Sequence, residues 1–106
     1  MKIAEITYTR GKLTTKLYEA TTDNGTIKYS DGEFDISDMM KVSTIDDFST
    51  IKIYYRAESK EMGIVTILAY LQIVLQSYSG TAKATIEKHI SDIENKKYKA
   101  IELDCG

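Results

Sequence analysis

The chain has 106 residues, a formal charge of −2 at pH 7, and 42% hydrophobic against 28% charged residues. This length supports one domain, residues 1–106, with one hydrophobic core, and the composition excludes a disordered chain. A single cysteine, Cys105, excludes an internal disulfide and a cysteine-based zinc site, and the lack of proline excludes proline-rich motifs.

The first two elements are predicted strands, because residues 2–9 and 13–20 alternate apolar and polar side chains with a period of two. The Arg10-Gly11 dipeptide between them predicts a two-residue hairpin loop. With that loop Glu5 lies opposite Lys16, a favourable cross-strand pair, which supports this register.

A second hairpin is predicted from residues 26–30 and 33–37, joined at Asp31-Gly32. The connection before it, at residues 23–25, fits a loop of two or of three residues. Only the three-residue form continues one apolar face from the first hairpin into the second, and we therefore expect that form. The predicted face consists of Ala4, Ile6, Tyr8, Leu13, Leu17, Ile27, Tyr29, Phe34 and Ile36.

Residues 38–49 carry no clear pattern, and we expect a short helical turn or an irregular crossing there. Residues 50–56 alternate again and predict a fifth strand, and residues 99–104 are compatible with a last one.

An uncharged run at residues 62–78 predicts a long apolar helix over about 59–79, with Ser59 as its N-cap. A second, amphipathic helix is predicted over about 81–97. The expected fold class is α+β: an antiparallel β-meander of four to five strands packed on a long central apolar helix, with the second helix beside it.

The apolar run is slightly short for a membrane span and contains glutamines, so we expect a buried core helix and no membrane contact. Its back face would be covered by the second helix or by another subunit, because exposed aliphatic side chains gain free energy on burial. The alternative oligomer interface consists of Val65, Ala69 and Ile73.

Charge is unevenly distributed along the chain. Between residues 19 and 47 there are eight acidic residues and only two lysines. Such an acidic surface could dock a basic partner, including a protein whose groove normally holds nucleic acid, or it could simply keep strand edges from aggregating. The predicted partner-binding residues are Asp31, Glu33, Asp35, Asp38, Asp46, Asp47 and Tyr54.

Tyr54 joins this set because Tyr54 and Tyr55 point to opposite faces of one strand, so that one of them should reach the surface. Direct nucleic-acid binding is not expected, because the protein is acidic and the sequence shows no basic stripe.

The sequence contains two candidate chemical sites. Asp31, Glu33 and Asp35 have the spacing of a calcium loop, but the glycine is misplaced and no glutamate occupies the twelfth position. His89 with Cys105 could form a nucleophile–base pair, but Cys105 lies one residue from the end of the sequence. We predict no metal, no cofactor and no enzymatic activity.

Short strands that lead into an apolar helix, over residues 26–78, resemble the layout of bacterial pleckstrin-homology-like domains, and this resemblance implies a binding domain. From the residues themselves we expect a non-catalytic protein-interaction module: a small inhibitor or regulator of phage or mobile-element type, such as an inhibitor of a CRISPR nuclease. The alternative is a self-associating structural domain. Since the N-terminal residues lack a signal-peptide pattern, we expect a cytoplasmic protein, in the host cytoplasm if viral.

Overall fold

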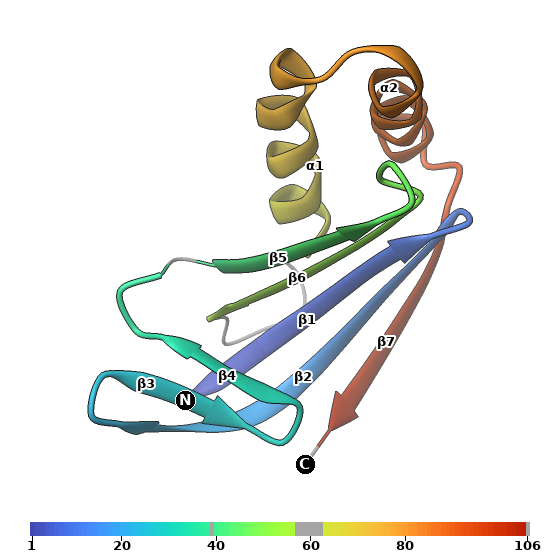
Figure 1. The fold of residues 1–106 in the computed structure, drawn as a ribbon. Coiled ribbons are helices and arrows are strands. Elements are labelled where there is room, and N and C mark those ends of the chain that lie inside the picture. Colours follow the sequence, from blue (N-terminus) through green and yellow to red (C-terminus); the bar gives the residue numbers. More distant parts are fainter. Residues whose placement is uncertain (39, 57–62, 106) are drawn as a thin grey trace.

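The computed structural model describes residues 1–38, 40–56 and 63–105, with side chains up to residue 103. Seven strands and two α-helices follow one another along the chain (Figure 1). Their bounds are β1 Lys2–Thr9, β2 Lys12–Asp23, β3 Thr26–Tyr29, β4 Gly32–Asp35, β5 Met40–Ile45, β6 Thr50–Arg56, α1 Gly63–Val74, α2 Gly80–Glu94 and β7 Lys99–Cys105. A short 3₁₀ helix, η1, covers Leu75–Ser77.

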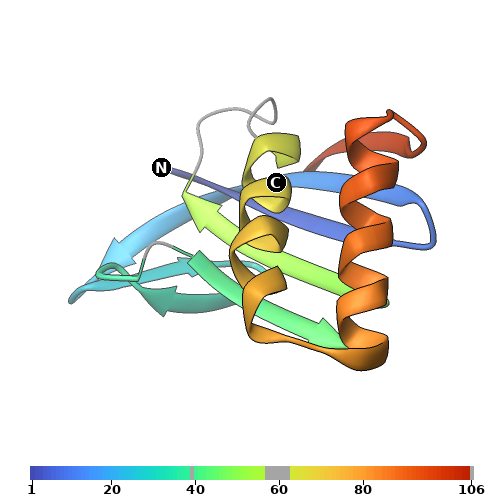
Figure 2. The ribbon, with the colours of Figure 1, turned by 90° about the horizontal axis from the view of Figure 1, so that it is seen from above.

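The fold is mainly β, and the predicted α+β class is wrong. Six strands form an antiparallel, nearly closed, barrel-like sheet in the order β4-β3-β2-β1-β6-β5, and β7 lies parallel to β2. Two short helices pack on one face of this sheet, in place of a four- to five-stranded meander on a long central helix (Figures 1 and 2). The sheet is centred on β1 and β2, which lie outside the range of the pleckstrin-homology-like resemblance.

The β1–β2 hairpin has the predicted register. Glu5 lies opposite Lys16, and Lys2 opposite Glu19 with an ion pair of 3.8 Å. Arg10 and Gly11 both have positive φ angles, of 50° and 72°. Two such residues in succession form the hairpin turn whose twist matches that of the strands, which explains why the loop needs only two residues.

The β2–β3 connection is shorter than predicted, and the single apolar face is therefore wrong. Asp23 pairs with Thr26, so that the loop has two residues, Asn24 and Gly25, both with positive φ. One residue fewer reverses the facing of the strand that follows. Ile27 therefore lies on the opposite face of the sheet from Ala4.

The β3–β4 hairpin is also displaced from its predicted register. Tyr29 pairs with Gly32, and Ile27 pairs with Phe34. The tip of the hairpin is therefore Ser30-Asp31 instead of Asp31-Gly32.

Residues 40–45 form an edge strand, β5, where an irregular crossing was expected. Only Val42 is partly buried in this strand, so the apolar alternation that identifies strands is weak. The turn that follows holds three consecutive residues with positive φ, Asp46, Asp47 and Phe48. It buries the ring of Phe48 against the ring of Tyr78, at a centroid distance of 4.8 Å.

The apolar run does not form one long helix. The α-helix ends at Val74, η1 follows, and the chain becomes extended at Tyr78 before α2 begins. The predicted N-cap, Ser59, lies outside the described residues. At its other end α1 approaches the sheet closely: a Cβ on Gly63 would lie 3.2 Å from Oγ1 of Thr15.

The sheet has a distinct cluster of buried residues on each face. The larger cluster lies between the sheet and the helices and includes Ile6, Ile53, Ile67, Leu71 and Ile86, each 0% exposed. The smaller cluster lies where the β3–β4 hairpin folds in front of β1 and β2 (Figure 1), and its members are Ile3, Ala20, Ile27, Phe34 and Tyr54. In the described part of the chain, neither helix has the length and apolar character that a membrane span requires.

Candidate functional site

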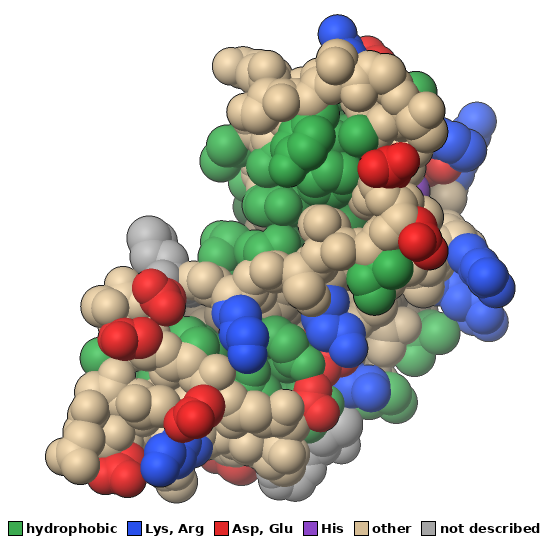
Figure 3. Space-filling view, in the orientation of Figure 1, with side chains coloured by type: hydrophobic (Ala, Val, Ile, Leu, Met, Phe, Trp, Pro, Cys, Tyr) green, Lys and Arg blue, Asp and Glu red, His purple; other side chains and the backbone are tan. Residues whose placement is uncertain are grey.

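The helix-free face of the sheet carries a group of basic side chains, which we call the lysine face. The register aligns Lys16 with Glu5, and Glu5 with Tyr54, so that these residues point to one side. Every second residue along a strand, and the residue paired with it on the next strand, point to the same side of the sheet. The pairings of β5 with β6 and of β7 with β2 therefore place lysines of those strands on this face as well. The lysine face consists of Lys12, Lys16, Lys41, Lys52 and Lys99. In Figure 3 blue side chains gather over the middle of the sheet, below the helices.

These lysines have no acidic partners within ion-pair distance in the described part of the chain. The ion pairs found there join Lys2 to Glu19, Lys28 to Asp23, and Lys88 to Asp92. Lys41 instead donates to the backbone oxygen of Glu33, at 3.4 Å. The face therefore keeps a local excess of positive charge in a protein whose net charge is −2.

Two of the lysines lie directly beside each other. Lys12 on β2 pairs in register with Lys99 on β7. Like charges opposite one another on neighbouring strands are destabilising. An anion bound between them would remove this repulsion.

The aliphatic side chains of Ile45, Ile101 and Leu103 share this face, and hydroxyl side chains occupy other positions between the lysines. They occupy the same face by the same register argument, and Oγ1 of Thr9 lies 2.9 Å from Oγ1 of Thr50 in a hydrogen bond. The set is Thr7, Thr9, Thr14, Ser43 and Thr50. Lysine and hydroxyl donors together are the side chains that commonly bind phosphate oxygens.

At the end of the face that the β3–β4 hairpin covers, two carboxylates, Glu5 and Asp31, are hydrogen-bonded to two tyrosines, Tyr18 and Tyr54. We call this group the carboxylate–tyrosine centre. Glu5 is only 4% exposed and accepts hydrogen bonds from Tyr18, at 3.4 Å, and Thr7, at 3.5 Å. The hydroxyl of Tyr54 donates to Asp31 at the tip of the β3–β4 hairpin. This bond fastens the hairpin over the sheet.

The same contacts shift the pKa values in this centre. The Tyr54 hydrogen bond is the main cause that lowers the pKa of Asp31, and the charges of Lys52 and Lys16 lower it further. Burial, followed by the hydrogen bond to Asp31, raises the pKa of Tyr54 above its ordinary value. Burial, followed by the charge of Asp31, raises the pKa of Tyr29 to about 12.

A cleft of about 340 Å³ opens at the other end of the face, between the β1–β2 and β5–β6 turns. We call it the turn cleft. Its lining residues are Thr9, Arg10, Lys12, Asp46, Ser49 and Thr50. Two cations and three hydroxyls against one carboxylate suit a small anion.

The structure divides the predicted acidic docking set. Asp31 is hydrogen-bonded to Tyr54, and Asp46 and Asp47 lie in the β5–β6 turn, at the other end of β5 from Asp38. Glu33, Asp35 and Asp38 are exposed together near β4. Hydrogen bonds from the backbone N–H and the hydroxyl of Ser37 lower the pKa of Asp35.

Tyr54 is not a surface anchor. It is 8% exposed, and so is Tyr55, so the expectation that one of this pair reaches the surface is wrong. The β3–β4 hairpin covers Tyr54, and the helices cover Tyr55. At this point β6 is therefore covered on both faces, by the helices on one side and by the β3–β4 hairpin on the other.

The alternative interface residues are exposed. Val65 is 54% and Ile73 73% exposed, and Ala69 is exposed between them. The second helix packs against α1 on another side and leaves this stripe uncovered.

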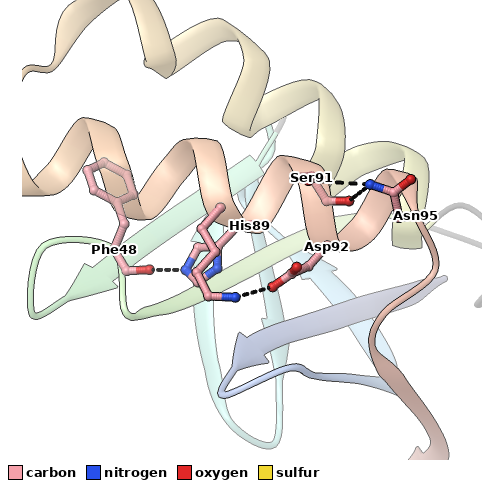
Figure 4. Close-up of polar contacts among 6 residues, drawn as sticks. Phe48, His89, Ser91, Asp92 and Asn95 are labelled. Atoms are coloured by element: carbon pink, nitrogen blue, oxygen red, sulfur yellow. Dashed lines mark hydrogen bonds and ion pairs between the residues drawn. The ribbon is translucent and has the colours of Figure 1, made fainter.

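His89 is held by structural contacts (Figure 4). Its Nε2 lies 2.7 Å from the backbone oxygen of Phe48, and its ring packs edge-on against Tyr8 at 4.9 Å. The neighbouring Asp92 pairs with Lys88 at 2.7 Å, which is the main cause that lowers its pKa. The two contacts of His89 join α2 to the β5–β6 turn and to β1. The side chain of Cys105 lies outside the described ones, so the structure does not test a pair of His89 with Cys105.

Sequence reasoning missed the lysine face because its members come from four strands. A local signal was present: Lys12, Thr14 and Lys16 alternate with buried residues along β2, as Thr50 and Lys52 do along β6. Only the strand order brings these polar rows together.

The fold and the lysine face thus define a small β-rich domain with one helix-covered face and one basic face. No family model, curated protein sequence or solved structure matches the chain.

Proposed function

We propose that the chain is a non-catalytic binding module that holds a single-stranded nucleic acid on its lysine face. The observation that carries this proposal is the group of five lysines on the face of the sheet that the helices leave free, which form no ion pair with the described acidic residues. Phosphate backbones bind such surfaces through charge neutralisation and release of counterions, largely without regard to sequence.

The shape and charge around the face argue against an anionic membrane as partner. The β3–β4 hairpin folds in front of β1 and β2, and the exposed acids Glu33 and Asp35 lie on it (Figure 1). A flat anionic bilayer that approached this face would meet those carboxylates and be repelled. A narrow chain can pass beside the hairpin and reach Lys16 and Lys52, which are half-buried.

The side chains of the face favour a phosphate backbone over an acidic protein. Protein interfaces gain most of their energy from buried aromatic and aliphatic anchors at their centre. Here the central aromatic rings of Tyr18 and Tyr54 are already buried by the protein itself. The aliphatic side chains exposed on this face, Ile45 and Leu103, lie on the outer strands β5 and β7. Since the rings of Tyr18 and Tyr54 are not available for bases to stack on, binding should depend little on base sequence and strongly on salt.

The groups best suited to proton transfer take part in structural contacts, which supports a binding role. Glu5 accepts hydrogen bonds from Tyr18 and Thr7, Asp31 from Tyr54, and His89 is bound to the Phe48 backbone.

Fluorescence anisotropy with a labelled, mixed-sequence single-stranded oligonucleotide tests the proposal. The double variant Lys16→Glu/Lys52→Glu should bind at least about tenfold more weakly than wild type at about 50 mM salt. The matched control is Lys83→Glu/Lys97→Glu, which makes the same charge change at exposed positions in and just after α2. This control should lose far less affinity.

Three results would overturn the proposal. One is the absence of oligonucleotide binding by wild type, and another is an equal loss in the two double variants. The third is stronger binding of an acidic peptide of equal charge, because the face would then fit a protein partner better.

A second candidate function is self-association through α1, favoured by the 73% exposure of Ile73. The helix carries no charged residue, so a charged partner would find no counter-charge on it. Two copies crossing antiparallel at Ala69 would place Val65 of each against Ile73 of the other, and the small side chain allows close approach. Sedimentation tests this: Ile73→Glu should convert a dimer to a monomer, and a wild type that is monomeric at high concentration contradicts it.

A further inference from the structure

We propose that the turn cleft binds a phosphomonoester: the terminal phosphate of the strand that lies on the lysine face. This inference rests on the proposed function and adds to it a preference for phosphorylated ends.

The position of the cleft supports an end-binding role. Thr9 and Thr50 form the last cross-strand pair between β1 and β6, and beyond them the sheet gives way to two turns. A strand that follows the lysines toward this edge therefore ends its contact with the protein in the cleft.

The charges of the cleft match a phosphomonoester better than a phosphodiester. Arg10 and Lys12 line the cleft together with the single carboxylate of Asp46. Lys99 adds a third cation, because it pairs in register with Lys12 and its backbone N–H donates to the oxygen of Gly11, at 2.8 Å. The lining residues alone have an excess of one positive charge, and Lys99, which lies beside Lys12 outside the lining, raises the local excess to two. This charge suits a group that carries about −1.5 to −2 at neutral pH, whereas an internal diester carries −1.

The hydrogen-bond donors of the cleft also suit three phosphate oxygens. Arg10 is an exposed residue of the two-residue turn and offers a planar set of N–H groups. The Thr9 and Thr50 hydroxyls are bonded to each other, which uses one of their two protons and leaves the second one for a ligand. Ser49 donates to the backbone oxygen of Ile45, so it contributes an acceptor to the cleft and no donor.

Asp46 is the one lining residue of the cleft that should repel a phosphate. Removing its charge should therefore strengthen phosphate binding, whereas the other substitutions weaken it. Its carboxylate reduces the positive charge that a phosphate meets. Replacing it with the isosteric amide, in Asp46→Asn, should therefore strengthen binding of a phosphorylated end and leave binding of an unphosphorylated end nearly unchanged.

The experiment compares three oligonucleotides of one sequence, carrying a 5′-phosphate, a 3′-phosphate or no terminal phosphate, by anisotropy with the full chain. One of the phosphorylated ends should bind at least about fivefold more tightly than the unphosphorylated strand. Arg10→Gln should remove this preference. Lys41→Gln, the matched loss of one charge at the other end of the face, should weaken all three strands alike and preserve the preference.

Competition separates the sources of the phosphate group. Inorganic phosphate and a nucleoside monophosphate should each reduce the preference while the unphosphorylated strand stays bound, because the lysines hold the rest of the chain. If a mononucleotide alone binds as tightly as the phosphorylated strand, the ligand is a free nucleotide and the end-binding inference is wrong.

The failure of this inference can be told apart from the failure of the proposed function. Equal binding of all three strands by wild type, or an equal loss for all three in Arg10→Gln, overturns the terminal-phosphate site and leaves polyanion binding intact. Absence of binding for all three strands overturns the function itself.

Discussion

The two faces of the same sheet differ in how far other parts of the chain cover them. On one face, Ile6 and Ile53 are fully buried under Ile67 and Leu71 of α1. On the other, lysines and hydroxyls on the same strands stay accessible, and only the β3–β4 hairpin covers one end. Because successive residues of a strand point to opposite sides, substitutions one residue apart should alter stability and the proposed binding separately.

The largest expected effect comes from the covered face. Ile67→Ala, at a position 0% exposed, should lower the free energy of unfolding by about 2–5 kcal/mol, because it leaves a cavity between α1 and the sheet. Ile73→Ala makes the same change on the exposed side of the same helix and should cost less than about 0.5 kcal/mol in the monomer. Urea denaturation of both variants measures the contrast. Equal costs would mean that α1 does not pack as described.

The polar end of the uncovered face should make stability depend on alkaline pH. The pKa of Tyr29 rises from 10.0 to about 12 in the folded state, and burial raises that of Tyr54 as well. The folded state holds these protons more tightly, so their contribution to stability is complete below about pH 10 and is lost as the pH rises through the folded values. Urea denaturation at several pH values should show this decline, and constant stability up to about pH 12 would contradict it.

A smaller effect is expected where the hairpin is fastened to the face. Tyr54→Phe removes the hydrogen bond to Asp31 and should cost about 1 kcal/mol at neutral pH. Tyr78→Phe, at an exposed tyrosine, is the control and should be close to neutral.

The cost of Tyr54→Phe should also depend on acid pH. The pKa of Asp31 is lowered in the folded state, so the stabilisation is present above its ordinary value of 3.8 and is lost as the pH falls through the folded value. Wild type and variant should converge there in urea denaturation. A difference that stays constant in acid would show that Asp31 is not the partner.

The smallest expected effect is a gain of stability within the lysine face. Lys99→Glu places an acid beside Lys12 and should raise the free energy of unfolding by about 0.2–1 kcal/mol. The same variant should bind the oligonucleotide more weakly, since it removes one cation and neutralises another. Lys97→Glu, at an exposed position outside the face, controls for the charge change. A variant that is both less stable and tighter binding would contradict the proposed role of this pair.

The sequence predicted elements better than it predicted their arrangement. The β1–β2 register followed from the Arg10-Gly11 loop and from the Glu5–Lys16 pair, both of which are local. At Asn24-Gly25 two loop lengths fitted equally well, and the assumption of one apolar face selected the wrong one. That single residue decided whether Ile27 joined the main core or formed a second one on the other side.

The lysine face could not be predicted from the sequence, because it too depends on how the strands are arranged. Lysines that are far apart along the chain became neighbours only through the order of the strands, in which β7 returns beside β2. Two of the predicted docking residues, Asp31 and Tyr54, proved to be partners of each other. Docking of a basic protein by Glu33, Asp35 and Asp38 stays a prediction.

The salt dependence of oligonucleotide binding tests the central claim most directly. If the five lysines of the uncovered face each neutralise one phosphate, a plot of log K against log salt for wild type should have a slope of about −3.5. Lys16→Glu/Lys52→Glu should reduce the magnitude of this slope to about 2 or less. Because Glu at position 16 would face Glu5, binding is measured at a temperature at which the variant is still folded. A slope near zero for wild type, or an unchanged slope in the double variant, would contradict binding on this face.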